Sequence, residues 1–255
     1  MRPVFICLLA LSLTACNSSG KKKNRTSNND TAKTEQPPAA TIQPVKGTRA
    51  DIPPGIRFTG SLKEVWSWKD RNGDNLLITT LTEPYADKEK NEFGEEGQSA
   101  ELHASLFTRT EGEYVLAWKL DDKEKSCPFD ITCDFVKDAL TVTDLDANGL
   151  AEVTLLYRMA CRSDVSPAEM QLVMYEGQNK YVLKGLTWYG SPEDKFEVTE
   201  STANLETLPG YKKTEEEFMK TWGRYESEKG FAGAPPAFLS YARKRWMMFV
   251  KEGNE

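Results

Sequence analysis

The chain has 255 residues, of which 39% are hydrophobic, and a formal net charge of −6. That length is enough for one large domain with a buried core. The acidic balance excludes a nucleic-acid-binding protein, because nucleic-acid-binding faces are basic.

The first 15 residues have the pattern of an export signal. Arg2 precedes an apolar run over 4–13, about ten residues, whereas a membrane span needs ~20. The run ends in Leu13-Thr14-Ala15-Cys16, which resembles the lipobox of bacterial lipoproteins. In that family the cysteine is acylated, and two or three acyl chains hold a protein to a membrane. We expect export, cleavage before Cys16 and a lipid anchor on it; the alternative is an ordinary secretory signal cut elsewhere.

Residues 16–55 are expected to form a disordered tether. They contain seven Lys/Arg and three Asp/Glu, whereas 56–255 contain 25 and 36. Apolar residues do not recur there at a helical or strand period, so the segment has no face to bury. A basic segment beside acyl chains favours anionic headgroups. Asn17 resembles the outer-membrane sorting signal of Gram-negative lipoproteins. We therefore expect the protein to be located in the cell envelope, at the outer membrane if the host is Gram-negative.

Four pairs of apolar runs flank turn residues in the central part of the chain. Asn72-Gly73, Glu111-Gly112, Asn148-Gly149 and Gly177 with its neighbours are typical of β-hairpin turns. The paired runs are 65–68 with 76–81, 102–108 with 114–120, 140–144 with 152–159, and 170–175 with 181–186. This pattern predicts a single, mainly β domain over 56–255, an antiparallel meander forming a sandwich or a propeller-like sheet.

The last part of the chain changes to a helical period. Pro235-Pro236 suits a helix start, and Phe238, Ala242 and Trp246 share one face. We expect a helix over about 236–251, docked on the sheet by its aromatic face; a helix on a membrane surface or a partner is the alternative. A shorter helix is expected within 213–228.

The run from Asp144 to Glu152 has the order of a calcium loop. Oxygen ligands at alternate positions and a glycine at the sharp turn can wrap a hard cation. The predicted ligands are Asp144, Asp146, Asn148, the Leu150 carbonyl and Glu152. The order resembles the calcium loops of FG-GAP repeats, and it departs from the EF-hand pattern at Leu155. The alternative is a plain hairpin turn; 70–74 are a looser echo that could be a second copy.

Three cysteines lie beyond the expected tether: Cys127, Cys133 and Cys161. In an exported protein we expect one disulfide, and we favour Cys127–Cys161 because both lie at the ends of predicted elements. Cys127–Cys133 is the alternative. The longer link would stabilise the fold by roughly 3–4 kcal/mol.

The sequence contains few candidates for catalytic chemistry. His103 is the one histidine, and a triad with Ser163 and Asp164 lacks a nucleophile elbow, so we assign no catalytic residues. Arg162 and Asp164 are candidate ligand contacts, because a guanidinium can hold a carboxylate or phosphate. The alternative for 161–167 is a structural loop between strands.

Several runs together resemble a family of small bacterial proteins labelled as surface polysaccharide biosynthesis proteins. The resemblance covers most of 62–250. Its central runs are Cys127-Pro128-Phe129-Asp130-Ile131, Asp144-Leu145-Asp146, Ala151-Glu152-Val153, Cys161-Arg162-Ser163-Asp164-Val165-Ser166-Pro167 and Met174-Tyr175-Glu176-Gly177. It implies a link to surface polysaccharide and supplies no catalytic residues.

The first functional hypothesis is a non-catalytic envelope lipoprotein that supports polysaccharide assembly or binds envelope glycan. Trp66, Trp68, Trp188 and Tyr189 could stack on sugar rings, although core packing explains most tryptophans. The alternatives are a hydrolase or transferase acting on glycan, and a structural module that binds envelope proteins.

Overall fold

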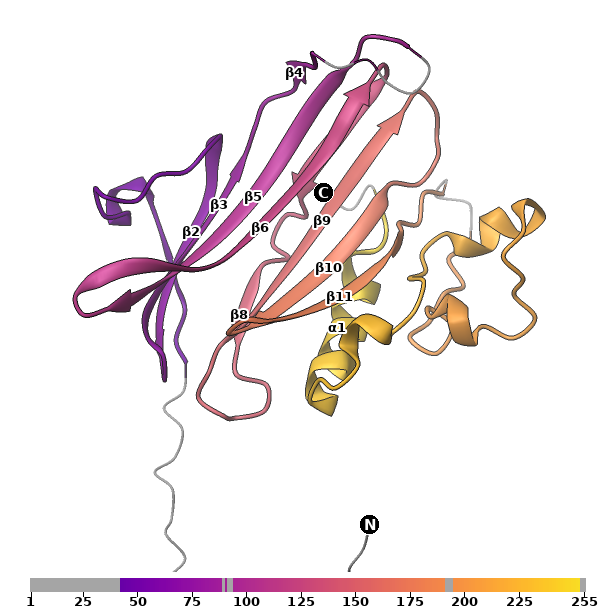
Figure 1. Ribbon diagram of the computed structural model, residues 1–255. Helices are drawn as coiled ribbons and strands as arrows, with labels where there is room; N and C mark the ends of the chain where they lie inside the picture. The colour runs from indigo at the N-terminus through magenta and orange to yellow at the C-terminus, as the bar shows by residue number, and fades with distance from the viewer. Residues whose placement is uncertain (1–41, 89, 91–93, 191–194, 253–255) are drawn as a thin grey trace, which may run out of the picture. The chain divides into compact units, whose positions relative to one another are not determined.

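The computed structural model describes residues 42–88, 90, 94–190 and 195–252. The predicted signal peptide, Cys16 and the first part of the predicted tether lie outside these residues. The described residues form two antiparallel sheets that face each other, with a C-terminal helix on the outer face of the second sheet (Figure 1). The mainly β, antiparallel fold class is therefore confirmed, in its sandwich form.

The first sheet is built on two predicted hairpins. Its path is β1-β2-β3-β5-β4, and β6 pairs with β5. Both hairpins form, and their turns lie where the sequence predicts them. The strands are β1 (Val45–Gly47), β2 (Ser61–Asp70), β3 (Gly73–Leu81), β4 (Tyr85–Ala86), β5 (Gln98–Thr110) and β6 (Glu113–Cys127).

The second sheet contains the other two predicted hairpins. Its path is β11-β10-β9-β7, and the short β8 pairs with β9 in antiparallel register. The sequence did not predict β7, which is only partly buried and lies at the edge of the sheet. The strands are β7 (Asp130–Phe135), β8 (Thr141–Thr143), β9 (Glu152–Arg162), β10 (Glu169–Glu176) and β11 (Asn179–Leu186).

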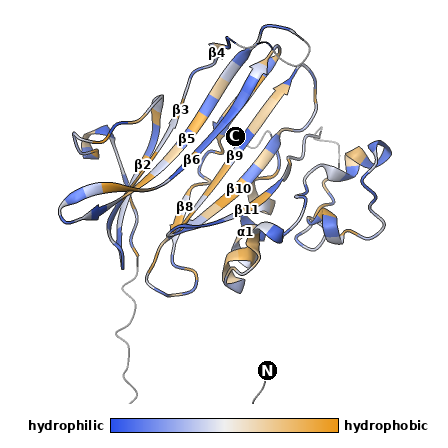
Figure 2. Cartoon of the chain, in the orientation of Figure 1, coloured by the Kyte–Doolittle hydropathy of each residue, from blue (hydrophilic) through white to orange (hydrophobic). Residues whose placement is uncertain are grey.

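Strand β9 separates the two main cores. Because side chains alternate across a strand, Val153, Leu155 and Tyr157 pack toward the first sheet, whereas Leu156 packs toward the helix. Both faces of β9 are thus covered, and its hydropathy is correspondingly high (Figure 2). The loops at the two ends of β9 are therefore anchored to the best-buried strand of the molecule.

The helix α1 (Pro236–Phe249) closes the second core. Phe238, Ala242 and Trp246 are fully buried at helical spacing, and the Trp246 indole donates to the Gly223 carbonyl at 3.0 Å. The expected docking by the aromatic face is confirmed. In the described part of the chain, no helix has the length and apolar character needed to cross a membrane.

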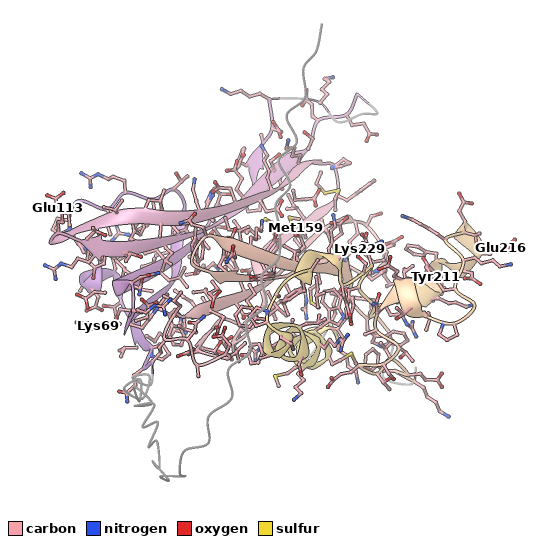
Figure 3. The ribbon with its side chains drawn as sticks, turned by 60° about the horizontal axis from the view of Figure 1, so that its bottom comes forward. Lys69, Glu113, Met159, Tyr211, Glu216 and Lys229 are labelled. Carbon is pink, nitrogen blue, oxygen red and sulfur yellow. A yellow bond between two sulfur atoms is a disulfide. The ribbon has the colours of Figure 1, made fainter. Side chains whose placement is uncertain are left out.

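The expected helix within 213–228 is a shorter 3₁₀ segment, η3 (Glu215–Thr221). It ends before Gly223, whose φ of +78° breaks a helical path. Two more single-turn 3₁₀ helices, η2 (Leu205–Thr207) and η4 (Lys229–Phe231), lie in the same long connection between β11 and α1. Figure 3 shows Tyr211 and Glu216 on this connection, away from Lys69 and Glu113 on the first sheet.

The folded domain begins earlier than residue 56, which corrects the predicted tether boundary. Strand β1 pairs with β2, and the 3₁₀ turn η1 (Arg49–Asp51) follows it. Ile52 and Ile56 then pack on Val65, Leu76 and Ile78 at the outer face of the first sheet. The sequence hid this role because these apolar residues are spaced irregularly among polar ones and prolines.

A disulfide connects the two sheets, and it is the favoured pairing. Cys127 at the end of β6 is bonded to Cys161 near the end of β9, with their Cα atoms 5.4 Å apart. Cys133 is a buried free thiol, and burial raises its pKa to about 11. Cys133 is therefore an unreactive core residue.

Candidate metal centre

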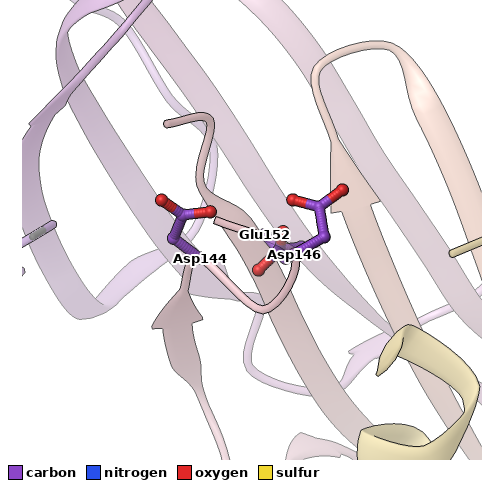
Figure 4. Close-up of side chains that lie close together, drawn as sticks. All are labelled: Asp144, Asp146 and Glu152. Atoms are coloured by element: carbon purple, nitrogen blue, oxygen red, sulfur yellow. The ribbon is translucent and has the colours of Figure 1, made fainter. Parts of the chain in front are cut away.

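Three carboxylates converge at the loop between β8 and β9. Asp144, Asp146 and Glu152 each offer one oxygen, and these oxygens lie within 4.8 Å of one another (Figure 4). Asp144 and Asp146 lie on the loop, while Glu152 begins β9. Because Glu152 is paired with Thr143 of β8 and Glu176 of β10, its position is fixed by the sheet.

The backbone of the loop is held by its own side chains. Asp144 accepts a hydrogen bond from the Gly149 amide at 3.1 Å, and Asp146 accepts one from the Asn148 amide at 3.2 Å. Ala147 and Gly149 have positive φ values of 57° and 80°, which turn the chain sharply. The Asp, Asn and Gly residues thus form the turn, and the turn brings the three carboxylates close together.

Glu152 is the buried member of the cluster. Glu152 is fully buried, with 0% of its surface exposed. Its Oε2 accepts hydrogen bonds from the Leu145 amide at 2.8 Å and from the Thr143 hydroxyl at 3.0 Å. Its Oε1 has no hydrogen-bond partner among the described residues. Burial raises the pKa of Glu152 to about 7, and the carboxylates of Asp146 and Glu176 add to this rise against the two hydrogen bonds.

The carboxylates of the cluster form no ion pair within the described residues, and the Arg71 guanidinium at the loop binds the Asn148 carbonyl instead. None of the ion pairs there joins a lysine or arginine to Asp144, Asp146 or Glu152. The Oδ1 of Asp144 is also buried without a hydrogen-bond partner in that part of the chain. Three converging carboxylates with two buried, unpartnered oxygens are the donor set that a hard cation such as Ca²⁺ prefers.

The predicted ligand Asn148 directs its amide nitrogen, rather than its oxygen, toward two carboxylates. The Asn148 amide nitrogen donates to Asp146 at 3.1 Å and to Glu176 at 2.6 Å, and the Asn148 oxygen accepts from the Leu150 amide at 2.7 Å. The structure therefore brings together the three predicted carboxylate ligands. Asn148 also connects the loop to Glu176 at the end of β10, a contact that no local spacing in the sequence could reveal.

The turn between β2 and β3 docks onto this loop. Asp70 accepts from the Ala151 amide at 3.2 Å, and Arg71 donates its backbone amide to the Gly149 carbonyl at 2.8 Å and its side chain to the Asn148 carbonyl at 3.1 Å. The echo of the calcium loop over 70–74 is thus a partner of the loop rather than a second copy. It fastens one sheet to the other beside the carboxylates.

The two predicted ligand contacts after β9 are occupied within the protein. Arg162 binds Glu252 at 2.6 Å, donates to the Ser166 carbonyl, and lies over the Tyr189 ring at 5.1 Å. Asp164 accepts from the Ser166 amide at 3.0 Å. These contacts support the structural interpretation of 161–167, a loop held between strands.

The remaining sequence candidates also have partners in the fold. His103 on β5 has its Nδ1 2.5 Å from Asp121 on β6 and its Nε2 3.5 Å from Glu101, so both ring nitrogens face carboxylates of its own sheet. Of the aromatics considered for sugar stacking, Trp68 is buried in the core, and Trp188 packs on Phe196.

Comparison of the chain with family models, with curated proteins and with solved structures returned no match.

Proposed function

We propose that this chain is a calcium-binding accessory module, tethered by lipid to the cell envelope and linked to surface polysaccharide. The observation that carries the calcium part is Glu152, a fully buried residue whose Oε1 lacks a hydrogen-bond partner among the described residues. One carboxylate oxygen of Glu152 lies within 4.8 Å of oxygens of Asp144 and Asp146. A buried carboxylate without a partner costs free energy, and a bound cation removes that cost.

Calcium fits the donor set better than magnesium or zinc. All the converging atoms are oxygens, and a loop that has only partly rigid ligands suits the variable geometry of Ca²⁺. With so few carboxylates, the dissociation constant is expected in the range of extracellular calcium modules, about 10⁻⁴–10⁻³ M.

Isothermal titration of CaCl₂ into the whole chain, held in detergent and freed of metal with EGTA, tests this proposal. The wild type is expected to bind one Ca²⁺, whereas Glu152→Gln loses the binding because one charged ligand is gone. Asp164→Asn is the matched control, since it removes a carboxylate from the loop at the other end of β9. Absence of calcium binding by the wild type, or equal binding by Glu152→Gln, would overturn the calcium proposal.

The membrane tether rests on the lipobox, Leu13 to Cys16, which precedes the described residues. Acylation of Cys16 would hold the β domain near the membrane surface through the basic segment that follows this cysteine. Metabolic labelling with palmitate is expected to mark the wild type but not Cys16→Ala. An unlabelled wild type, or a labelled Cys16→Ala, would contradict the tether.

The link to surface polysaccharide rests on the family resemblance over 62–250. We infer a supporting role rather than a catalytic one, because the polar groups predicted as candidates, Arg162 and His103, are engaged with neighbouring carboxylates. A deletion strain is expected to show a changed polysaccharide profile, restored by the wild-type gene and not by Cys16→Ala. An unchanged profile would sink this part of the proposal.

A further inference from the structure

A hollow lies at the β11 edge of the second sheet. It shares no lining residue with the carboxylate cluster. Its volume is about 480 Å³. Its floor is formed by β11 and the segment 224–226, which adds to β11 by an antiparallel bridge between Gly185 and Tyr225. The Leu186 amide donates to the Arg224 carbonyl at 3.1 Å, and the Glu226 amide donates to the Lys184 carbonyl at 2.8 Å.

The alternation of side chains decides what this floor presents. Tyr225 is fully buried, so Arg224 and Glu226 beside it face the opposite side, toward the hollow. Gly185 allows the approach, because a Cβ there would lie 2.1 Å from the Arg224 carbonyl oxygen. A side chain at Gly185 would therefore push away the segment that carries half of the floor.

The wall of the hollow is the connection that contains η2 and η3. Arg224 binds this connection at two points, because it donates to the Thr202 carbonyl before η2 at 2.9 Å and to the Lys220 carbonyl in η3 at 2.7 Å. Tyr211 and Phe218 line the hollow from this wall, and Phe218 keeps 47% exposure. Figure 3 shows Tyr211 on this segment.

The lining combines aromatic rings with charges of both signs. Three carboxylates and three cations surround the two rings, so the lining as a whole carries no net charge. Glu169 and Lys184 form an ion pair of 3.1 Å on the floor. The charged lining residues are Glu169, Glu206, Glu226, Lys184, Lys213 and Arg224.

This chemistry discriminates between classes of ligand. An anion would meet the carboxylates, and an acyl chain would strip water from six charged groups. A neutral sugar has hydroxyls that can donate to carboxylates and accept from lysines, and a C–H face that can pack on an aromatic ring. The volume also matches the lower range of small-molecule sites.

We propose that this hollow binds a neutral hexose or N-acetylhexosamine unit of envelope glycan, with Tyr211 and Phe218 as the stacking wall and Glu226 accepting a hydrogen bond from a sugar hydroxyl. The inference rests on the proposed link to polysaccharide and names the site through which the module would contact it.

Ligand-observed NMR with the whole chain in detergent tests the inference. The probes are glucose, galactose, N-acetylglucosamine and glucuronate, each at millimolar concentration. At least one neutral sugar is expected to bind, and Phe218→Ala and Glu226→Gln should each weaken that binding by about tenfold, equivalent to one strong contact. Met219→Ala is the matched control, because Met219 is an exposed neighbour on η3 that does not line the hollow.

The inference is overturned if no neutral sugar binds, if glucuronate binds best, or if Phe218→Ala and Glu226→Gln bind as tightly as wild type. Thermal melting of each variant verifies that it is folded. A changed polysaccharide profile in the deletion strain together with failed sugar binding would reject this site and leave the proposed function standing.

Discussion

The loops at the two ends of β9 make an instructive comparison. Each is polar, and each contains residues that the sequence offers as ligand contacts. At the loop after β9, the positive charge of Arg162 is neutralised within the protein, because Arg162 forms an ion pair with Glu252 at 2.6 Å. The loop before β9 gathers Asp144, Asp146 and Glu152, and none of them forms an ion pair with a lysine or arginine of the described residues.

The difference separates a structural charge from one that awaits a ligand. A partly buried arginine with a carboxylate partner needs nothing further, whereas a buried carboxylate among others is destabilising until a cation arrives. Residue type alone does not make this distinction, since both loops are rich in Asp and Ser or Asn. The distinction comes from the partners of these residues in the fold, such as Glu252, which lies 90 residues from Arg162 in sequence.

The largest effect on stability is expected from removing the Cys127–Cys161 disulfide, which lies beside the loop after β9. The Cys127→Ala/Cys161→Ala variant should lose about 3–4 kcal/mol of unfolding free energy, because the crosslink no longer restricts the unfolded chain. Urea unfolding with and without calcium measures this loss, which should be the same in both. Cys133→Ala is the control for removing a sulfur; a double variant no less stable than this control would contradict the assignment.

The next largest effect concerns the ion pair itself. Glu252→Ala should lower the unfolding free energy by about 2–4 kcal/mol, because Arg162 is left partly buried without its carboxylate. Arg162→Ala should cost a similar amount, and the double variant should cost less than the sum of the two. Additive losses in urea unfolding would show that the two side chains do not interact.

A smaller effect of opposite sign is expected at the first loop. In EGTA, Glu152→Gln should be more stable than wild type by about 1 kcal/mol, because it removes a buried charge without a matching cation. In calcium at 100 times its dissociation constant, the wild type should gain about 2.7 kcal/mol and the variant much less. The same urea experiment measures both; a variant that is less stable in EGTA would count against the account of Glu152.

The smallest effect is the pH dependence of the ion pair. Burial raises the pKa of Glu252, but hydrogen bonds from Arg162, Thr187 and the Ala168 amide outweigh this, so the folded pKa lies below the ordinary value of 4.5. The stabilisation that ionised Glu252 gives the folded state is therefore complete above pH 4.5 and is lost as the pH falls through the folded pKa. Between pH 5 and pH 3, wild type should lose more stability than Glu252→Gln; parallel curves would contradict it.

Much of the fold was predictable from local signals. The turn pairs Asn72-Gly73 and Asn148-Gly149 predicted hairpins that the structure contains, and the spacing of Phe238 to Trp246 predicted α1. Strands β1 and β7 were missed because they are short edge strands whose partners, rather than their own patterns, define them.

The candidate sites were predictable only where one stretch of chain supplies them. Asp144, Asp146 and Glu152 follow from loop spacing. Glu176 approaches the loop through the pairing of β10 with β9, and Asp70 through the docking of the β2–β3 turn from the other sheet. The hollow at the β11 edge had no sequence signal, because its lining comes from separate segments, β11 and the connection that follows it, which only the fold brings together.

Amide hydrogen exchange with and without calcium tests the central claim most directly, because both loops report in one experiment. The reporters before β9 are the Gly149 and Ala151 amides and the Arg71 amide that donates to Gly149; those after it are the Ser166 and Ala168 amides. We predict that calcium slows exchange in the first group and leaves the second unchanged, and that Glu152→Gln abolishes the difference. Equal rates in the first group with and without calcium would contradict the claim that this loop binds the ion.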